Sequence, residues 1–398
     1  MTGWTSARRA VPGLLAALLL APVPARAGGH RNVILMIADG FGAQHLAAAR
    51  IVSEHILDRR LCMAEVMRSG HTGTLLNDTA DAVVTDSAAA ATQMATGHRA
   101  VVRVLSMSPE PPPAGTAYRT ILEIAQARGM STGLVTTSGI TDATPGGFAA
   151  HVLDRGREAE VAEQELAHRV DVLMGGRREF FLPRSAEGSR RSDERNLLAE
   201  ARGAGYAVVE DGPGMDQVSR GKVLGLFSLG DMAFERRRAG TGQPSLAAMA
   251  EKALALLSQG GRGFFAMIEG GRIDHAAHAN DAADVVGDAL AFDEAVCAAR
   301  DFQRRHPDTL LIVTSDHETG GLAIVAGGRD GAALDPDVAG RARAPEPDVD
   351  RLRLVFATGG HTASPVLVYG VGPGSDGLAG LHHNTELFDI MVAALSGR

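Results

Sequence analysis

The order of apolar segments predicts an α/β fold, a three-layer α/β/α sandwich around a mostly parallel central sheet, with a small surface insertion. Short runs rich in Val, Ile, Leu and Phe show little alternation, as expected of strands covered on both faces. Longer helical patterns lie between these runs, and a β-α-β-α order is typical of a parallel sheet between two helical layers. With 398 residues, 45% of them hydrophobic, the chain can bury a large core.

The segments that fit buried strands are 32–38, 132–137, 170–174, 206–209, 223–228, 263–268, 310–314 and 366–369. The clearest helical patterns between them are 118–128, 158–168, 245–258 and 281–305. Two stretches rich in Gly, Pro or charged residues, 108–115 and 327–347, interrupt the alternation, and we expect a surface loop and a surface insertion there.

The N-terminus has the pattern of a secretory signal peptide. Arg8 and Arg9 precede the apolar stretch 10–23, and Ala25-Arg26-Ala27 fits a cleavage site. The stretch is shorter than the roughly 20 residues that cross a bilayer, which favours cleavage over a membrane anchor. We therefore expect a signal peptide at 1–27, one mature domain at 28–398, and a periplasmic or secreted protein.

Charge and cysteine content narrow the possibilities further. The formal net charge is −8, which disfavours a nucleic-acid partner because such proteins usually present a basic face. No stretch of the mature chain is long and apolar enough to suggest a membrane span. Cys62 and Cys297 are the two cysteines, so an exported chain allows at most one intramolecular bridge. Because both lie in apolar, helix-like contexts, we expect buried free thiols.

Metal-ligand residue types follow several of the predicted strands. Asp39 and Gly40 follow the first strand, and Asp316-His317 follow the strand 310–314. In parallel α/β sheets, ligands bind outside the carboxyl ends of the strands. Adjacent Asp and His suit zinc with mixed nitrogen and oxygen ligands. Each motif alone also fits an ordinary turn or a solvated loop.

The segment 267–278 is the most informative. A strand leads into Glu269, two glycines, and then Asp274 and His278, which a helix would place on one face. That pair can bind one metal, while Glu269 suits a separate cation that prefers oxygen. The alternative is a helix whose N-cap is Asp274. Further on, His361 follows two glycines and supplies another candidate ligand.

Two other segments offer groups that suit phosphate. Ser87 precedes a run of alanines and would lie at the start of a helix, where phosphate is favoured. The alternative is a Ser or Asp that merely caps that helix. Asp142 and Thr144 offer oxygen ligands, and Arg155, four residues after His151, can bind a phosphate through two hydrogen bonds.

Taken together and in this order, the motifs resemble the alkaline phosphatase family from Asn32 through the last predicted strand. The resemblance implies two zinc ions and one magnesium ion. The implied first zinc site has one carboxylate and two histidines, Asp274, His278 and His361. The implied second zinc site has two carboxylates and one histidine, Asp39, Asp316 and His317. The implied magnesium ligands all offer oxygen, and they are Asp39, Thr144 and Glu269.

The resemblance also implies a catalytic domain that hydrolyses phosphate monoesters, with Ser87 as the nucleophile and Arg155 as the phosphate-binding residue. Ser87 would form a phosphoserine, which water then hydrolyses. The sequence has no G-x-S-x-G elbow, so metal activation is the economical explanation for a reactive serine. His275 and Asp142 are possible auxiliary residues that leave the identity of the third metal open. A homodimer is expected from the resemblance alone.

Two other functions remain open at this stage. A related two-zinc phosphodiesterase would share the zinc ligands, but Glu269, Thr144 and Arg155 favour a monoesterase. A metal- or phosphate-scavenging binding protein would need no nucleophile, and Ser87 beside Asp86 argues against it.

Overall fold

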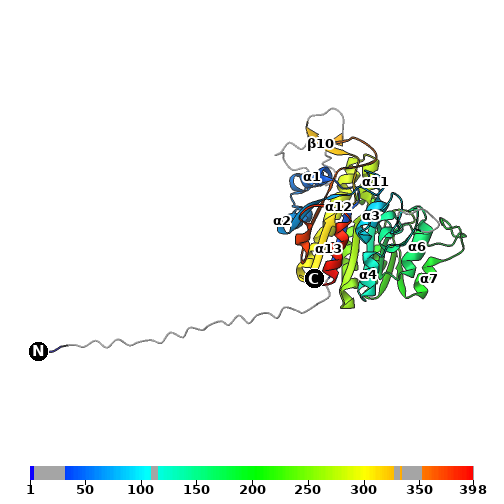
Figure 1. Ribbon diagram of the computed structural model, residues 1–398, viewed down its shortest axis with the longest axis horizontal. Helices are drawn as coiled ribbons and strands as arrows, with labels where there is room; N and C mark the ends of the chain where they lie inside the picture. Colours follow the sequence, from blue (N-terminus) through cyan, green and yellow to red (C-terminus); the bar gives the residue numbers. More distant parts are fainter. Residues whose placement is uncertain (4–31, 109–114, 327–331, 334–351, 398) are drawn as a thin grey trace.

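A ten-stranded sheet with helices on both faces forms the centre of the protein (Figure 1). The computed structural model describes residues 1–3, 32–108, 115–326, 332–333 and 352–397. The predicted α/β/α sandwich is confirmed. Residues 4–27 of the predicted signal peptide, most of the proline-rich loop and most of the predicted insertion lie outside the described residues.

The sheet is parallel except at one strand. β1 (Asn32–Ala38) lies between β7 (Phe264–Gly270) and β8 (Thr309–Thr314) and is parallel to both. β14 (Val366–Val371) is antiparallel to β8 and to β2 (His71–Leu76). Across the sheet the order is β15-β2-β14-β8-β1-β7-β3-β4-β6-β5. The remaining strands are β3 (Ser131–Gly139), β4 (Val172–Gly176), β5 (Tyr206–Val209), β6 (Lys222–Leu226) and β15 (Gly380–His383).

The central strand shows why its sequence lacks alternation. Every residue of β1 is buried, because successive side chains enter different cores on opposite faces of the sheet. Ile34 and Met36 belong to one hydrophobic cluster, whereas Val33, Leu35 and Ile37 belong to the other. A strand covered on both faces must be apolar throughout, as the sequence is here.

Each face of the sheet carries its own layer of helices. The helices whose residues enter the first cluster are α1 (Ala43–Ile51), α2 (Cys62–Ser69), α10 (Leu246–Leu257) and α12 (Ala282–Arg305). Those that enter the second are α3 (Ser87–Thr96), α4 (Ile121–Ala127), α5 (Ala143–Ala149), α6 (Glu158–Ala167), α7 (Leu197–Gly203) and α13 (Glu386–Leu395). In Figure 1, α3, α4 and α13 lie side by side.

Shorter elements surround this framework. The helices are α8 (Gly212–Gln217), α9 (Glu235–Arg238) and α11 (Arg272–His278). A small antiparallel sheet joins β10 (Leu322–Ala326), β12 (Leu352–Phe356) and β11 (Ala332–Ala333), and β10 lies beside α1 in Figure 1. β9 (Glu318–Thr319) pairs with β13 (His361–Thr362). Among the described residues, no helix has the length and apolar character needed to cross a bilayer.

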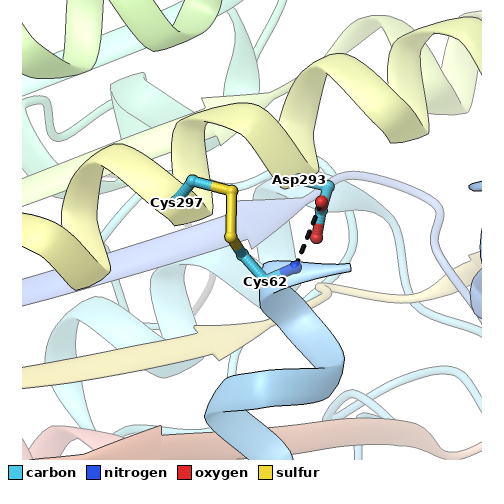
Figure 2. A group of neighbouring side chains, drawn as sticks. All are labelled: Cys62, Asp293 and Cys297. Carbon is cyan, nitrogen blue, oxygen red and sulfur yellow. Dashed lines mark hydrogen bonds between the residues drawn. A yellow bond between two sulfur atoms is a disulfide. The ribbon is translucent and has the colours of Figure 1, made fainter. Parts of the chain in front are cut away.

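The expectation of free thiols is wrong. Cys62 at the start of α2 and Cys297 in α12 form a disulfide, and their Cα atoms lie 5.2 Å apart (Figure 2). Asp293, one turn earlier on α12, accepts hydrogen bonds from the backbone N–H groups of Cys62 and Met63 at 3.2 and 2.8 Å. The same contact that caps α2 therefore brings the two cysteines within bridging distance.

Candidate active site

The predicted ligands of three strands meet at one edge of the sheet. Asp39 follows β1 directly, Glu269 lies near the end of β7, and Asp316 and His317 follow β8. Because the three strands are parallel neighbours, their carboxyl ends bring these side chains together.

Asp39, Asp316 and His317 form a buried cluster whose ligand atoms lie within 4.8 Å of one another. The Nε2 atom of His317 is 3.2 Å from Asp316 Oδ2 and 3.6 Å from Asp39 Oδ1. Neither of these two carboxylate oxygens has a hydrogen-bond partner, although both are buried. Asp316 Oδ1, in contrast, accepts the backbone N–H groups of Gly40 and His317 at 3.1 and 3.0 Å. Backbone hydrogen bonds thus hold Asp316 in place, while the carboxylate oxygens that face the middle of the cluster have no hydrogen-bond partner.

Asp274, His278 and His361 form a second cluster of the same size. α11 places Asp274 and His278 on one face, and His278 Nε2 is 3.2 Å from Asp274 Oδ2. The pairing of β13 with β9 brings His361 to the same place, where its Nε2 atom is 3.1 Å from that of His278. The Nδ1 atoms face the carbonyl oxygens of Gly359 and Thr85 at 2.7 and 2.8 Å. Both Nε2 atoms are therefore left to face the centre, as in histidines that bind a metal.

The electrostatics of these clusters fit a bound cation. Burial raises the pKa of Asp39 well above its usual range, and the like charges of Asp316, Asp274 and Glu269 raise it further. Burial also raises the pKa of Glu269, to about 8. Unpaired buried carboxylates are unfavourable unless a positive charge compensates them. A metal ion beside the unpartnered oxygens of Asp39 and Asp316 would provide this positive charge. The donor set therefore fits metal ions.

An oxygen-lined position lies beside the first cluster. Thr144 is buried in α5, and a hydrogen bond between Thr144 and Glu269 acts to lower the pKa of Glu269. Thr136 of β3 donates to Glu269 Oε2 at 2.5 Å. Oxygen donors alone suit magnesium better than zinc.

Ser87 is the first residue of α3, and its Oγ atom is 3.2 Å from His317 Nε2. The N-cap of this helix is Asp86, whose carboxylate accepts the N–H of Ala89 at 3.0 Å. The capping role therefore belongs to Asp86, and the Ser87 hydroxyl faces the cluster of Asp39, Asp316 and His317. It is also at the positive end of a ten-residue helix.

Arg155 lies on the segment that follows α5. Its guanidinium contacts Asp86 Oδ2 at 3.3 Å and Asp142 Oδ1 at 2.9 Å. Burial alone would lower the pKa of Arg155, but the charges of Asp142 and Asp86 outweigh this effect and raise it above its usual value. The guanidinium is therefore always cationic. Its contact with Asp86, the neighbour of Ser87, places a fixed positive charge beside the serine.

Sequence reasoning missed one member of this network. Arg177 follows β4 directly and contacts Asp142 at 3.1 Å, Glu158 at 2.7 Å and Asp231 at 2.8 Å. Its position at the carboxyl end of a strand, after two glycines, was the signal that could have found it.

His275 lies outside both clusters. Its Nδ1 atom is 2.6 Å from Arg272 Nη1 and 3.7 Å from Asp231. Burial raises the pKa of the Asp142 carboxyl, but the charges of Arg177 and Arg155 lower it well below its usual range. His275 is near enough to lower the pKa of Asp142 by a smaller amount.

Comparison with known proteins gives a consistent result. A family model described as alkaline phosphatase matches residues 30–337. The chain is 37% identical to the streptomycin-6-phosphate phosphatase of Streptomyces griseus, over 95% of this chain and 92% of that protein. Among solved structures, it is similar to alkaline phosphatase from the Antarctic bacterium TAB5, with 29% identity and a TM-score of 0.79 over 93% of this chain and 99% of that one.

The alkaline phosphatase of Thermus thermophilus has 28% identity and a TM-score of 0.81, over 93% of this chain and 92% of that one. The family model covers most of the chain, and the folds superpose over nearly their whole length. The chain therefore belongs to the alkaline phosphatase family of metal-dependent phosphate-monoester hydrolases.

Proposed function

We propose that this chain is an exported alkaline phosphatase that hydrolyses small phosphate monoesters through a phosphoserine at Ser87. The observation that carries the proposal is the Ser87 hydroxyl at a helix N-terminus, 3.2 Å from a three-ligand cluster and beside the cationic guanidinium of Arg155. Phosphoryl transfer depends chiefly on position and on stabilisation of charge, and these groups supply both.

Asp274, His278 and His361 would hold one zinc ion, and Asp39, Asp316 and His317 would hold a second. Asp39, Thr144 and Glu269 would hold magnesium. Bound there, the ions would supply the positive charge that lowers the pKa of the serine hydroxyl and neutralises the phosphate oxygens.

The protein's own groups then account for the rest of the reaction. Arg155 donates two hydrogen bonds to the phosphate and fixes its orientation, and Asp86 and Asp142 hold its guanidinium in place. Ser87 Oγ attacks phosphorus, the P–O bond to the alcohol breaks, and the alcohol leaves. Water then attacks the phosphoserine from the opposite side and releases inorganic phosphate and the free Ser87 hydroxyl. Two inversions give net retention at phosphorus.

The proposal includes export. The signal-peptide pattern at 1–27 and the Cys62–Cys297 disulfide support a periplasmic or secreted location, because disulfides persist in oxidising compartments. A homodimer remains a prediction, which light scattering on the purified protein tests directly.

The test compares initial rates at alkaline pH on a phosphate monoester and on the matching diester, with zinc plus magnesium and after chelation. We expect monoester turnover that chelation abolishes, and diester turnover slower by orders of magnitude. Preference for the diester would overturn the assignment of Thr144, Glu269 and Arg155.

The variant Ser87→Ala separates an enzyme from a binding protein. An enzyme with a serine nucleophile loses turnover on this change, while its affinity for inorganic phosphate survives. Acid-quenched wild-type protein incubated with labelled phosphate should carry label on the peptide that contains Ser87. No turnover by the metal-loaded wild-type protein on either ester would favour the binding protein instead.

A further inference from the structure

We propose that Glu123, His151 and His168 form an additional binding site for zinc or a similar divalent transition metal, separate from the candidate active site. Glu123 lies in α4, His151 follows α5, and His168 directly follows α6 as its C-cap. One ligand atom from each side chain lies within 4.8 Å of the other two. The phosphatase chemistry proposed above uses none of the three.

The spacing of the ligand atoms suits a tetrahedral ion. His151 Nε2 is 3.2 Å from Glu123 Oε1, and His168 Nδ1 is 3.8 Å from the same oxygen. Two ligands about 2.1 Å from a tetrahedral zinc ion lie about 3.4 Å from each other. In the cluster of Asp274, His278 and His361, the corresponding distances run from 3.1 to 3.7 Å. The two distances to Glu123 therefore lie within or close to the range found in that cluster.

Hydrogen bonding around His151 requires a cation at this place. Its Nδ1 atom is 2.9 Å from the carbonyl oxygen of Ser106, which can only accept, so Nδ1 donates. Nε2 of the neutral ring and the Glu123 carboxylate are then two acceptors that face each other. Either a proton or a metal must lie between them.

His168 favours the metal over the proton. A proton links two atoms, but three potential ligands converge here, and 3.8 Å is too long for a hydrogen bond between His168 and Glu123. Burial is the main cause that lowers the pKa of His168, which favours the neutral form of this ring. A neutral imidazole is the form that binds metals.

The surrounding contacts hold the three residues without using the ligand atoms. Glu123 Oε2 accepts the N–H of Thr120 at 2.8 Å as part of a capping box, which leaves Oε1 for the centre. Gln164 accepts from and donates to the backbone of His151, and Gln126 donates to the carbonyl of His168 at 2.7 Å. Such outer contacts orient metal ligands in known sites.

Two histidines and one carboxylate make up a donor set that zinc prefers, and magnesium or calcium does not. The side chains of His151, Glu123 and His168 are 16%, 22% and 25% exposed, so water can complete the coordination. An ion here would link α4, α6 and the segment that leads from His151 to Arg155. We therefore expect it to stabilise the segment that carries the phosphate-binding arginine.

The test uses the metal-loaded enzyme and its zinc content. Wild type, His168→Gln and the control His306→Gln are dialysed against the same zinc concentration, and zinc per chain is measured by mass spectrometry. His306 is a matched control because it is also a half-buried histidine directly after a helix, α12. Crystals of the wild type are measured at the zinc edge.

We expect wild type and His306→Gln to hold one more zinc per chain than His168→Gln. An anomalous peak should lie between Glu123, His151 and His168. Equal zinc contents, or a wild-type map without this peak, would overturn the proposal. The map decides alone if His168→Gln does not fold, and neither readout depends on whether Ser87 is the nucleophile.

Discussion

Single residues set the distances within the candidate active site, and Gly40 shows how. It has a φ of +72°, and a Cβ atom on it would lie 2.9 Å from the Cα atom of Asp274. Glycine is needed here both for the left-handed backbone and for the close approach of the two ligand-bearing segments. The Asp-Gly pair was visible in the sequence, but its reason, contact with α11, was not.

We expect Gly40→Ala to reduce monoester turnover by at least about tenfold, since a shift near 1 Å in a catalytic group has large kinetic effects. The added methyl group must push Asp274 away from its cluster or strain the turn after β1. The measurement is kcat/KM together with zinc content. Gly203→Ala, where a Cβ atom would meet nothing within 4 Å, is the control and should behave as wild type. Full activity in Gly40→Ala would show that the two segments separate freely.

Glu165 in α6 is fully buried, and neither of its carboxylate oxygens has a hydrogen-bond partner. Burial, with a smaller effect of Glu158, raises its pKa well above the usual value. The folded protein thus keeps a proton that the unfolded chain releases above about pH 4.5. Stability falls as pH rises from there to the folded pKa, and the loss is constant above it.

Glu165→Gln removes this titration while keeping the size of the side chain. We expect the variant to match wild type near pH 5 and to become more stable than wild type as pH rises, by up to about 1.4 kcal/mol per pH unit until the folded pKa is passed. Urea unfolding of both proteins across this pH range measures the difference. A difference that does not change with pH would mean that Glu165 is ionised in the folded state.

At the scale of residues, the sequence predicted the types that carry the chemistry better than their surroundings. The i, i+4 spacing of Asp274 and His278 was enough to place them together. The sequence left open whether Asp86 or Ser87 caps α3, and it did not reveal that Arg177 contacts Asp142. Those facts depend on contacts between segments distant in the chain.

At the scale of elements, close packing positions the nucleophile. α3 is buried along its whole length, and its alanines allow it to lie against α5. A Cβ atom on Gly147 of α5 would come within 2.7 Å of the Ala91 side chain. Small residues at this contact thus bring Ser87 and Thr144, which lie on the two helices, to one site.

The strands that form both cores were predictable, since burial on two faces imposes continuous apolar sequence. β15, at one edge of the sheet, and its neighbour β2 were not predicted, because their residues are partly exposed and show no strong apolar run. β9 and β13 were also missed, since two-residue strands carry no periodicity, although β13 brings His361 to its cluster.

The disulfide between α2 and α12 gives a prediction at the same scale. We expect the double variant Cys62→Ser/Cys297→Ser to fold with free energy of unfolding lower by about 2–5 kcal/mol, because the bridge closes a loop of more than 200 residues in the unfolded chain. Thermal unfolding of the variant should match that of reduced wild type. Equal stability of variant and oxidised wild type would show that the packing of Asp293 against α2 alone holds the two helices together.

The whole molecule should respond to loss of metal. Unpaired carboxylates at the centre of the sheet's carboxyl edge repel one another, and ions that bind only the folded state stabilise it by mass action. We therefore expect chelation to lower Tm as well as to abolish turnover, and zinc with magnesium to restore both. An unchanged Tm in chelator would contradict metal sites built into the folded protein.

The position of β1 has a consequence for how the enzyme is made. This strand is the first of the sheet in sequence, yet both of its neighbours, β7 and β8, come more than 200 residues later. The hydrogen bond from Gly40 to Asp316 joins residues 276 positions apart, and so does the bond between His361 and Thr85. Such long-range pairing makes folding slow. If the chain is exported as proposed, it would therefore stay inactive while it crosses the membrane from its N-terminus, until nearly all of it had emerged and could fold.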